Sequence, residues 1–423
     1  MANIIELDLS CKNLKTVPDL SGYPNLTTLY LSGNNLTELT NLPPTLLELQ
    51  CWNNHITSLD NLPPNLQYLF CSDNQLTSLD NLPASLKNLD CDNNQITSLD
   101  CLPPTLTDLN CKNNKISSLD RLPATLTYVT CDNNQLASLN NLPPVLIKLE
   151  CRCNKINALD NLPASLTTLD CTDNNINRLD KLPPALQSLY CSKNNIRTLN
   201  KLPNTLRELY CWYNKLVKIN KLPESLEVVE CNYNLITSIT RFPPQLQKIH
   251  CTSNKLTALS NLPASLVDLD CTSNKLTELE LPRSLINLVC GHNRLTKIIS
   301  PENLVKLRCN DNLLKIINLP DNLTDLDCEN NLLTELNYIP DSIDIYECID
   351  NNPFKYPFDA TIENIRAYNK FRYTYFKLKY SARIERLYLQ YKMYKIRDEL
   401  LAIALHPERI RKWISMGATF ADF

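Results

Sequence analysis

A twenty-residue repeat constrains this chain more than any other feature of its sequence. Residues 61–80, NLPPNLQYLFCSDNQLTSLD, carry the pattern L-P-x-x-L-x-x-L-x-C-x-x-N-x-[LI]-x-x-L, which returns every twenty residues through most of the 423-residue chain. A unit of this length can bury its apolar side only against its neighbours. The sequence therefore predicts one solenoid with a continuous core rather than two or three globular domains.

The pattern also predicts the path of the chain within each unit. The L-x-C segment favours a short strand, and stacked units place these strands in a parallel sheet on the concave face. The asparagine column, from Asn34 to Asn331 and Asn351, falls where the chain leaves the strand, so its amides can bond the backbone groups freed there. Proline in the following L-P segment predicts extended or polyproline backs rather than helices.

Most of the nineteen cysteines occupy one position of the repeat. They run from Cys51 to Cys271 at steps of twenty and end with Cys290, Cys309, Cys328 and Cys348. Side chains stacked in one column point the same way and do not bridge, so we expect a buried column of free thiols and a reducing compartment. The start, MANIIELDLS, lacks the features of a signal peptide, and no stretch is long and apolar enough to span a membrane.

Composition divides the chain into a repeat array of about eighteen units, residues 1–353, and a basic, tyrosine-rich tail, residues 354–423. The tail carries 14 Lys and Arg against 7 Asp and Glu, whereas the array carries 28 against 38. Thr361 is a suitable cap for a helix with Ile362, Ile365 and Tyr368 on one side, and later periodic runs predict one or two more helices. We expect the tail to cover the open end of the last repeat. The alternatives are contact with nucleic acid, an acidic membrane surface or an acidic protein.

The sequence offers no constellation of catalytic residues. Its four glycines form no phosphate-binding loop, and its four histidines are too dispersed for a metal site or a triad. We therefore expect a protein that is not an enzyme, with no cofactor, no metal and no small-molecule substrate.

The outward positions of the sheet face are the candidate binding residues. They include two aromatic groups, and exposed aromatic side chains often anchor protein interfaces. The alternative is that these residues simply favour strands. Acidic residues also gather on this face, at Asp90, Asp92, Asp108 and Asp132 and again near Asp268 and Asp325, and they favour a basic partner. The first aromatic group is Tyr30, Trp52, Tyr68 and Phe70; the second and larger is Tyr190, Tyr210, Trp212, Tyr213 and Tyr233.

Residues 66–79, with Cys71 in a slot usually filled by leucine and Asn74 at the fixed asparagine, resemble the leucine-rich repeat consensus. The twenty-residue period with L-P is similar to leucine-rich effector proteins of enteric pathogens. That family includes ubiquitin ligases with a Cys-x-Asp nucleophile, which Cys348-Ile349-Asp350 matches. However, we expect Cys348 to fill the core cysteine slot, with Asn351 after it, and a buried thiol is unreactive.

The end of the tail, ELLAIALHPERIRKWISMG at residues 399–417, resembles a segment that closes proteins of mimivirus-type giant viruses. The repeats are also similar to uncharacterised leucine-rich repeat proteins of those viruses. This resemblance implies the cytoplasm of an infected host, with packaging in the virion as a further option.

The sequence as a whole predicts a non-enzymatic scaffold that binds a host or viral protein through its concave sheet face. One alternative is an adaptor or effector linked to ubiquitin ligation. A second is contact of the basic tail with nucleic acid or a membrane.

Overall fold

The computed structural model describes residues 4–343, 349–357 and 359–374. Their contacts group into two compact units. One comprises the described repeats, residues 4–334 with 340–343 and 349–353, and the other comprises residues 335–339 with 354–357 and 359–374.

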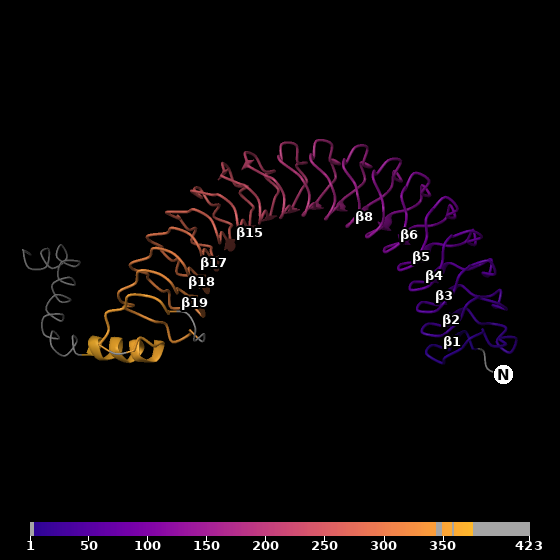
Figure 1. Cartoon of the computed structure of the whole chain (residues 1–423), viewed down its shortest axis with the longest axis horizontal. Coiled ribbons are helices and arrows are strands. Elements are labelled where there is room, and N and C mark those ends of the chain that lie inside the picture. Colours follow the sequence, from indigo (N-terminus) through magenta and orange to yellow (C-terminus); the bar gives the residue numbers. More distant parts are fainter. Residues whose placement is uncertain (1–3, 344–348, 358, 375–423) are drawn as a thin grey trace, which may run out of the picture. The chain divides into compact units, whose positions relative to one another are not determined.

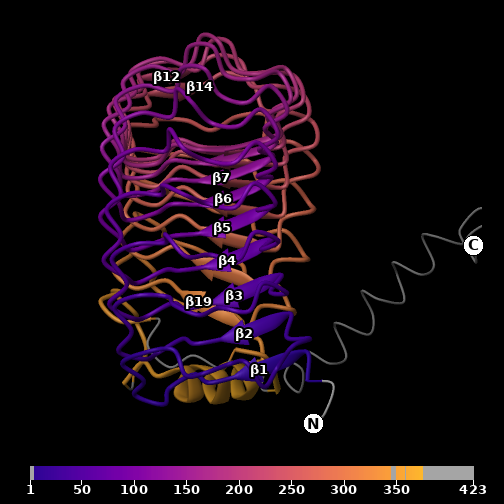
Figure 2. The ribbon, with the colours of Figure 1, turned by 90° about the vertical axis from the view of Figure 1, so that its right-hand side faces the viewer.

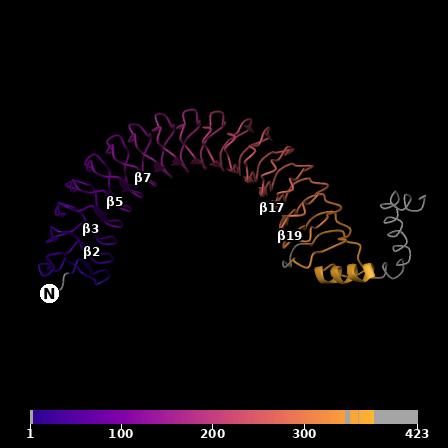
Figure 3. The same cartoon turned by 180° about the vertical axis from the view of Figure 1, so that it is seen from behind.

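The repeat unit is a parallel solenoid, as predicted. Among the described residues, seventeen strands form one sheet in which every pairing is parallel and successive repeats align without a shift, as Leu69 with Leu89 does. The strands line the inner side of the curve (Figures 1 and 3) and lie one above another (Figure 2). The strand expected in an eighteenth repeat would fall at residues 344–348, outside the described residues. The strands are β1 Glu6–Asp8, β2 Thr28–Tyr30, β3 Glu48–Gln50, β4 Tyr68–Phe70, β5 Asn88–Asp90, β6 Asp108–Asn110, β7 Tyr128–Thr130, β8 Lys148–Glu150, β9 Thr168–Asp170, β10 Ser188–Tyr190, β11 Glu208–Tyr210, β13 Val228–Glu230, β15 Lys248–His250, β16 Asp268–Asp270, β17 Asn287–Val289, β18 Lys306–Arg308 and β19 Asp325–Asp327.

The core consists of the repeated leucine, isoleucine and cysteine positions. Leu66, Leu69 and Cys71 are all fully buried, and the same slots are buried in the neighbouring repeats. All the cysteines among the described residues are free, including the buried column. Burial raises the pKa of these thiols, in Cys51 to about 12, so they remain protonated and pack as small apolar groups.

The asparagine column joins consecutive repeats, as its position in the pattern predicts. Nδ2 of Asn74 donates to the carbonyl oxygen of Cys51, at 3.0 Å, and to that of Cys71, at 3.1 Å. Its Oδ1 accepts from the backbone N–H of Ile56 at 2.9 Å. One buried amide therefore satisfies backbone groups of two repeats where the strand ends.

The last repeat departs from the predicted register. Asn352, not Asn351, donates to the carbonyl oxygens of Cys328 and Ile349, and its Oδ1 accepts from Leu333. Ile349 therefore takes the slot that we assigned to Cys348, and it is buried. The assignment of Cys348 and Asn351 to the core register was wrong, because a shift by one residue moves each side chain to a different position of the turn. Cys348 itself lies outside the described residues.

The backs of the repeats are mostly irregular, as the prolines predict, but some form short strands. β12 (Lys218–Ile219) pairs with β14 (Ser238–Ile239), and Ile298 bridges to Ile317. These pairings occur where isoleucine fills the last apolar slot of two successive repeats; the slot holds Val17 in the first repeat and leucine in the others. A β-branched side chain favours extended backbone, so this choice decides where a back strand forms.

The second unit contains a helix at residues 362–374. Thr361 Oγ1 accepts from the backbone N–H of Asn364 at 3.2 Å, which confirms the predicted cap. Within this unit, the backbone N–H of Leu336 donates to Tyr356 Oη and its carbonyl accepts from Asn369 Nδ2, both at 2.7 Å. The helices predicted after residue 375 lie outside the described residues. Over the described part of the chain, no helix combines the length and apolar character needed to cross a bilayer.

Candidate functional site

Two tyrosines stack on the sheet face near the middle of the array. Tyr190 on β10 and Tyr210 on β11 are register partners, and their rings lie 4.7 Å apart between centroids with planes 9° from parallel. Tyr190 Oη donates to Glu208 Oε2 at 3.1 Å. Burial and the Glu208 carboxylate raise the pKa of Tyr190 to about 12, so its phenol is a neutral donor at physiological pH.

Three more aromatic residues lie just past strand ends: Trp212 and Tyr213 follow β11, and Tyr233 follows β13. Tyr213 and Tyr233 stack at 4.2 Å with planes 10° apart, and Trp212 meets Tyr213 edge-on at 5.5 Å. Lys193 Nζ lies over the Trp212 ring at 5.5 Å from its centroid. We call Tyr190, Tyr210, Trp212, Tyr213 and Tyr233 the aromatic cluster; the structure brings these predicted residues together as a strand pair and a strand-end triplet.

The backbone of the triplet is unusual for residues of this size. Tyr213 and Tyr233 both have φ of 52°, in the left-handed region. The same slot, directly before the ladder asparagine, has positive φ throughout the array, where asparagine, aspartate, serine or glycine fills most positions. Asparagine and aspartate tolerate this conformation better than bulky side chains do. Two adjacent tyrosines in this slot are therefore held against their backbone preference.

The first predicted aromatic group is not one cluster. In the sheet register Gln50 lies between Tyr30 and Phe70, so these two rings belong to strands that are not neighbours. Trp52 and Tyr68 are exposed. Within the part of the chain that the structure describes, no ring contact joins these four residues. The expectation of a single group was wrong, because a non-aromatic residue separates Tyr30 from Phe70 in their column and Trp52 and Tyr68 make no ring contact with either.

The acidic residues of the sheet face fall into two kinds. Some have a cationic partner: Asp170 with Arg152 at 2.7 Å, Glu230 with Lys248 at 2.7 Å and Asp132 with Lys112 at 3.7 Å. In contrast, no ion pair reaches Asp90 or Asp108 from any described residue.

Asp90 and Asp108 line a hollow on this face, of about 240 Å³, that the sequence analysis missed. Tyr128, on β7, forms one side of it and is 46% exposed. The signal was present in the sequence, since large outward residues at 68 and 70 are followed by four small polar ones at 88, 90, 108 and 110 and then by Tyr128.

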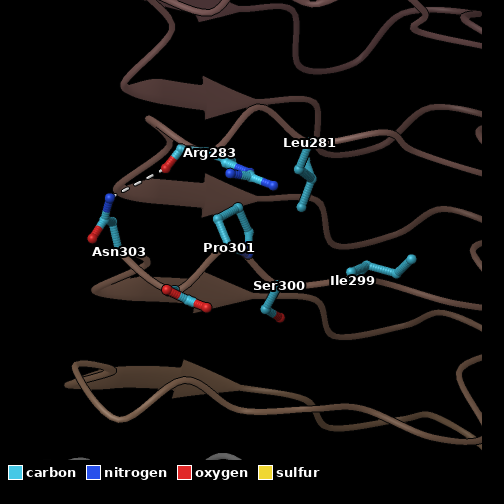
Figure 4. A pocket seen from close by; sticks show the side chains of 7 residues that line it. Leu281, Arg283, Ile299, Ser300, Pro301 and Asn303 are labelled. Carbon is cyan, nitrogen blue, oxygen red and sulfur yellow. Dashed lines mark hydrogen bonds between the residues drawn. The ribbon is translucent and has the colours of Figure 1, made fainter. Parts of the chain in front are cut away.

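Two further hollows adjoin on the backs of the repeats, around Ile299, which is 67% exposed. The larger, of about 420 Å³, is lined by Arg283, Ser300 and Pro301 among others, and Asn303 Nδ2 donates to the carbonyl oxygen of Arg283 beside it (Figure 4). Both hollows lie where the repeat shortens to nineteen residues.

No group of three or more His, Cys, Asp or Glu side chains that could hold a metal ion is found over residues 4–343, 349–357 and 359–374. His250 Nε2 lies 3.3 Å from Asp268 Oδ2, and His292 Nδ1 lies 3.4 Å from Asp311 Oδ2.

The in-register parallel strands, the buried leucine and cysteine columns and the asparagine ladder define a leucine-rich repeat solenoid. The chain belongs to the leucine-rich repeat family. Residues 64–104 match the model described as Leucine Rich repeats (2 copies). No curated protein sequence matches the chain.

Several solved structures share both the fold and a substantial part of the sequence. YopM from Yersinia enterocolitica WA-314 is 31% identical, with a TM-score of 0.72 over 84% of this chain and 88% of that one. YopM from Yersinia pestis, a leucine-rich effector protein, is 32% identical, with a TM-score of 0.59 over 77% of this chain and 88% of that one. The functional domain of InlJ from Listeria monocytogenes, which includes a cysteine ladder, is 31% identical, with a TM-score of 0.62 over 69% of this chain and 70% of that one. The chain is thus similar to bacterial leucine-rich repeat effectors and internalins.

Proposed function

We propose that the protein is a non-enzymatic scaffold that binds a protein partner through its sheet face, with the aromatic cluster as the anchor. The observation that carries the proposal is the stacked pair Tyr213 and Tyr233, which stays 49% and 46% exposed. Leucine-rich repeat solenoids offer side chains in registered columns on an extended surface, which suits protein binding.

The backbone of this pair supports a functional role over a structural one. A left-handed φ costs a bulky residue about 1–2 kcal/mol, and strained residues tend to gather at functional sites. Stacking returns about 0.5–1.5 kcal/mol per aromatic pair, so the arrangement adds little to the stability of the array. Half of each ring nevertheless stays uncovered, and a partner that buries both rings would gain their apolar area.

The test replaces both tyrosines with the residue that the slot most often holds. A Tyr213→Asn/Tyr233→Asn chain keeps the turn and removes the rings. The matched control is Ser253→Asn/Ser273→Asn, the same slot in the next two repeats. Partners captured from host lysate on the intact protein should be lost with the tyrosine variant and kept with the serine variant. Equal capture by both variants would exclude the aromatic cluster as the anchor.

A link to ubiquitin ligation is a second candidate, and the register of the last repeat favours testing it. Because Ile349 takes the core slot, the asparagine contacts give no reason to assign Cys348 to a core position. A ubiquitin-discharge assay on the intact chain and on Cys348→Ser separates the two functions. Thioester formation that depends on Cys348 would favour a ligase. The absence of thioester in both chains would exclude the ligase function and favour the scaffold function.

We also infer that the protein works in a reducing compartment. Three of the free cysteines, Cys11, Cys101 and Cys153, are exposed and would be open to oxidation elsewhere. The likeness of residues 399–417 to closing segments of giant-virus proteins supports the proposal that this compartment is the cytoplasm of an infected host. Fractionation of infected cells with an antibody to the array tests this location; recovery only outside cells would contradict it.

A further inference from the structure

The hollow on the sheet face is shaped by the sizes of consecutive outward residues. Phe70 on β4 and Tyr128 on β7 form its sides, and between them β5 and β6 present only Asn88, Asp90, Asp108 and Asn110. Parallel strands lie about 4.8 Å apart, so β4 and β7, with the short side chains of β5 and β6 between them, lie roughly 14 Å apart. The result is a hollow of about 240 Å³, room for one long side chain.

The floor of this hollow carries negative charge without a cationic partner in the described chain. Asp90 Oδ1 accepts from Ser72 Oγ at 2.7 Å and Asn110 Nδ2 at 3.0 Å, and Asp108 Oδ2 accepts from Thr107 Oγ1 at 2.6 Å. These neutral donors position the carboxylates and leave their charge in place. Three repeats further on, by contrast, Arg152 pairs with Asp170 at 2.7 Å.

We propose that this hollow receives an arginine side chain of a protein partner. This inference rests on the proposed function, because it assigns a specificity-determining contact to the same sheet face. A guanidinium presents donors on several edges and can bond carboxylates from two neighbouring strands together. One of its flat faces can also stack on the ring of Phe70 or of Tyr128 at the edge of the hollow. A lysine ammonium is a compact point charge and makes fewer of these contacts.

The charge of the surroundings agrees with this occupant. Asp92 and Asp73 lie nearby. Burial raises the pKa of Asp92, and the negative charges of Asp90 and Asp73 raise it further. An anionic ligand such as a nucleic acid would meet uncompensated carboxylates and be repelled. A cationic side chain would instead supply the missing countercharge.

The experiment uses the intact chain and a random-peptide display library as the probe. Peptides are selected on the native protein, and each selected peptide is then resynthesised with its arginine replaced by citrulline, a neutral isostere, or by lysine. Affinities are measured for the native chain, for Asp90→Asn/Asp108→Asn and for Asp270→Asn. Asp270 occupies the same column as Asp90, has no ion pair among the described residues and lies outside the hollow, so it is the matched control.

We expect arginine-dependent peptides whose affinity falls at least about tenfold in Asp90→Asn/Asp108→Asn, as the loss of charged hydrogen bonds predicts, and stays unchanged in Asp270→Asn. Citrulline should abolish binding and lysine should weaken it. Unfolding curves that match the native protein show that the variants fold. A peptide affinity that is unchanged in Asp90→Asn/Asp108→Asn, or a selection that yields no arginine-dependent peptide, would overturn the proposal.

Failure here is separable from failure of the proposed function. The Tyr213→Asn/Tyr233→Asn chain is measured with the same peptides and should bind them normally, because its substitutions lie far along the array from β4–β7. If Asp90→Asn/Asp108→Asn binds the peptides as the native chain does while the tyrosine variant still loses captured partners, only the proposed arginine contact is refuted.

Discussion

Tyr213 and Tyr233 stack with ring centroids 4.2 Å apart, although both hold a left-handed φ of 52°. The stack, about 0.5–1.5 kcal/mol for the pair, opposes the strain of about 1–2 kcal/mol in each of the two residues and does not exceed it. This relationship identifies the strand ends of repeats eleven and twelve as a surface whose form is not explained by the stability of the array.

The Tyr213→Asn/Tyr233→Asn chain should be at least as stable as the native protein. Relief of the left-handed strain, about 2–4 kcal/mol over the two residues, outweighs the lost stacking of about 0.5–1.5 kcal/mol, so we expect the free energy of unfolding to stay the same or to rise. Urea unfolding followed by circular dichroism measures the change. A loss of several kcal/mol would show that the pair is part of the structural framework instead.

Removing one ladder amide should destabilise the array. Asn134→Ala leaves the backbone N–H of Ile116 without its partner and removes one of the two amide donors from each of the carbonyls of Cys111 and Cys131, which keep Asn114 and Asn154. A buried unsatisfied group costs about 1–3 kcal/mol, so we expect a loss of at least about 1 kcal/mol. Gln135→Ala, one residue on and exposed, is the control and should stay within about 0.5 kcal/mol. The check is urea unfolding with hydrogen exchange around this repeat; equal effects of both variants would refute the ladder's role.

The cysteine column makes the protein sensitive to alkali. Burial raises the pKa of its thiols above the value of 9.0 that they regain on unfolding, to about 12 in Cys51 and Cys231. Below pH 9 both states keep the proton and this contribution to stability is complete. Between about pH 9 and 12 only the unfolded chain loses protons, so stability falls by up to about 1.4 kcal/mol per pH unit for each such thiol.

Thermal unfolding between pH 7 and 10 measures this slope. A Cys171→Ala/Cys191→Ala chain removes two of the thiols and should show a shallower decline above pH 9. A decline of the same steepness in both chains would mean that other groups, such as lysines, control the alkaline limit.

Back-strand pairing should depend on isoleucine in the last apolar slot. In Ile219→Leu/Ile239→Leu the pairing of β12 with β14 should weaken, while global stability changes by less than about 1.5 kcal/mol because the volume is conserved. The amide of Thr240, which donates to the carbonyl of Ile219 at 3.1 Å, should exchange faster with solvent. Leu119→Ile, in a repeat without a back strand, is the comparison. Unchanged exchange at Thr240 would show that the side chain does not determine the pairing.

Much of the fold could be predicted because each feature repeats. The spacing of Leu66, Leu69 and Cys71 predicts the strand and its buried face, and Asn74 predicts the turn, because the same short-range rules apply in every unit. The register of the last repeat could not be read in this way. There Cys348 and Asn351 fit the spacing, yet Asn352 makes the ladder contacts, since the final choice depends on hydrogen bonds to the preceding repeat.

The sites show the same division. The sequence by itself determined which side chains face outward on the strands, because alternation along a strand fixes the face and the repeat fixes the register. Only the tertiary structure decided which of them meet. It stacked Tyr213 on Tyr233, separated Tyr30 from Phe70 by a strand, and enclosed Asp90 and Asp108 between Phe70 and Tyr128. Contacts between columns depend on ring orientation and on the sizes of neighbours from different repeats, and a pattern within one repeat carries no information on either.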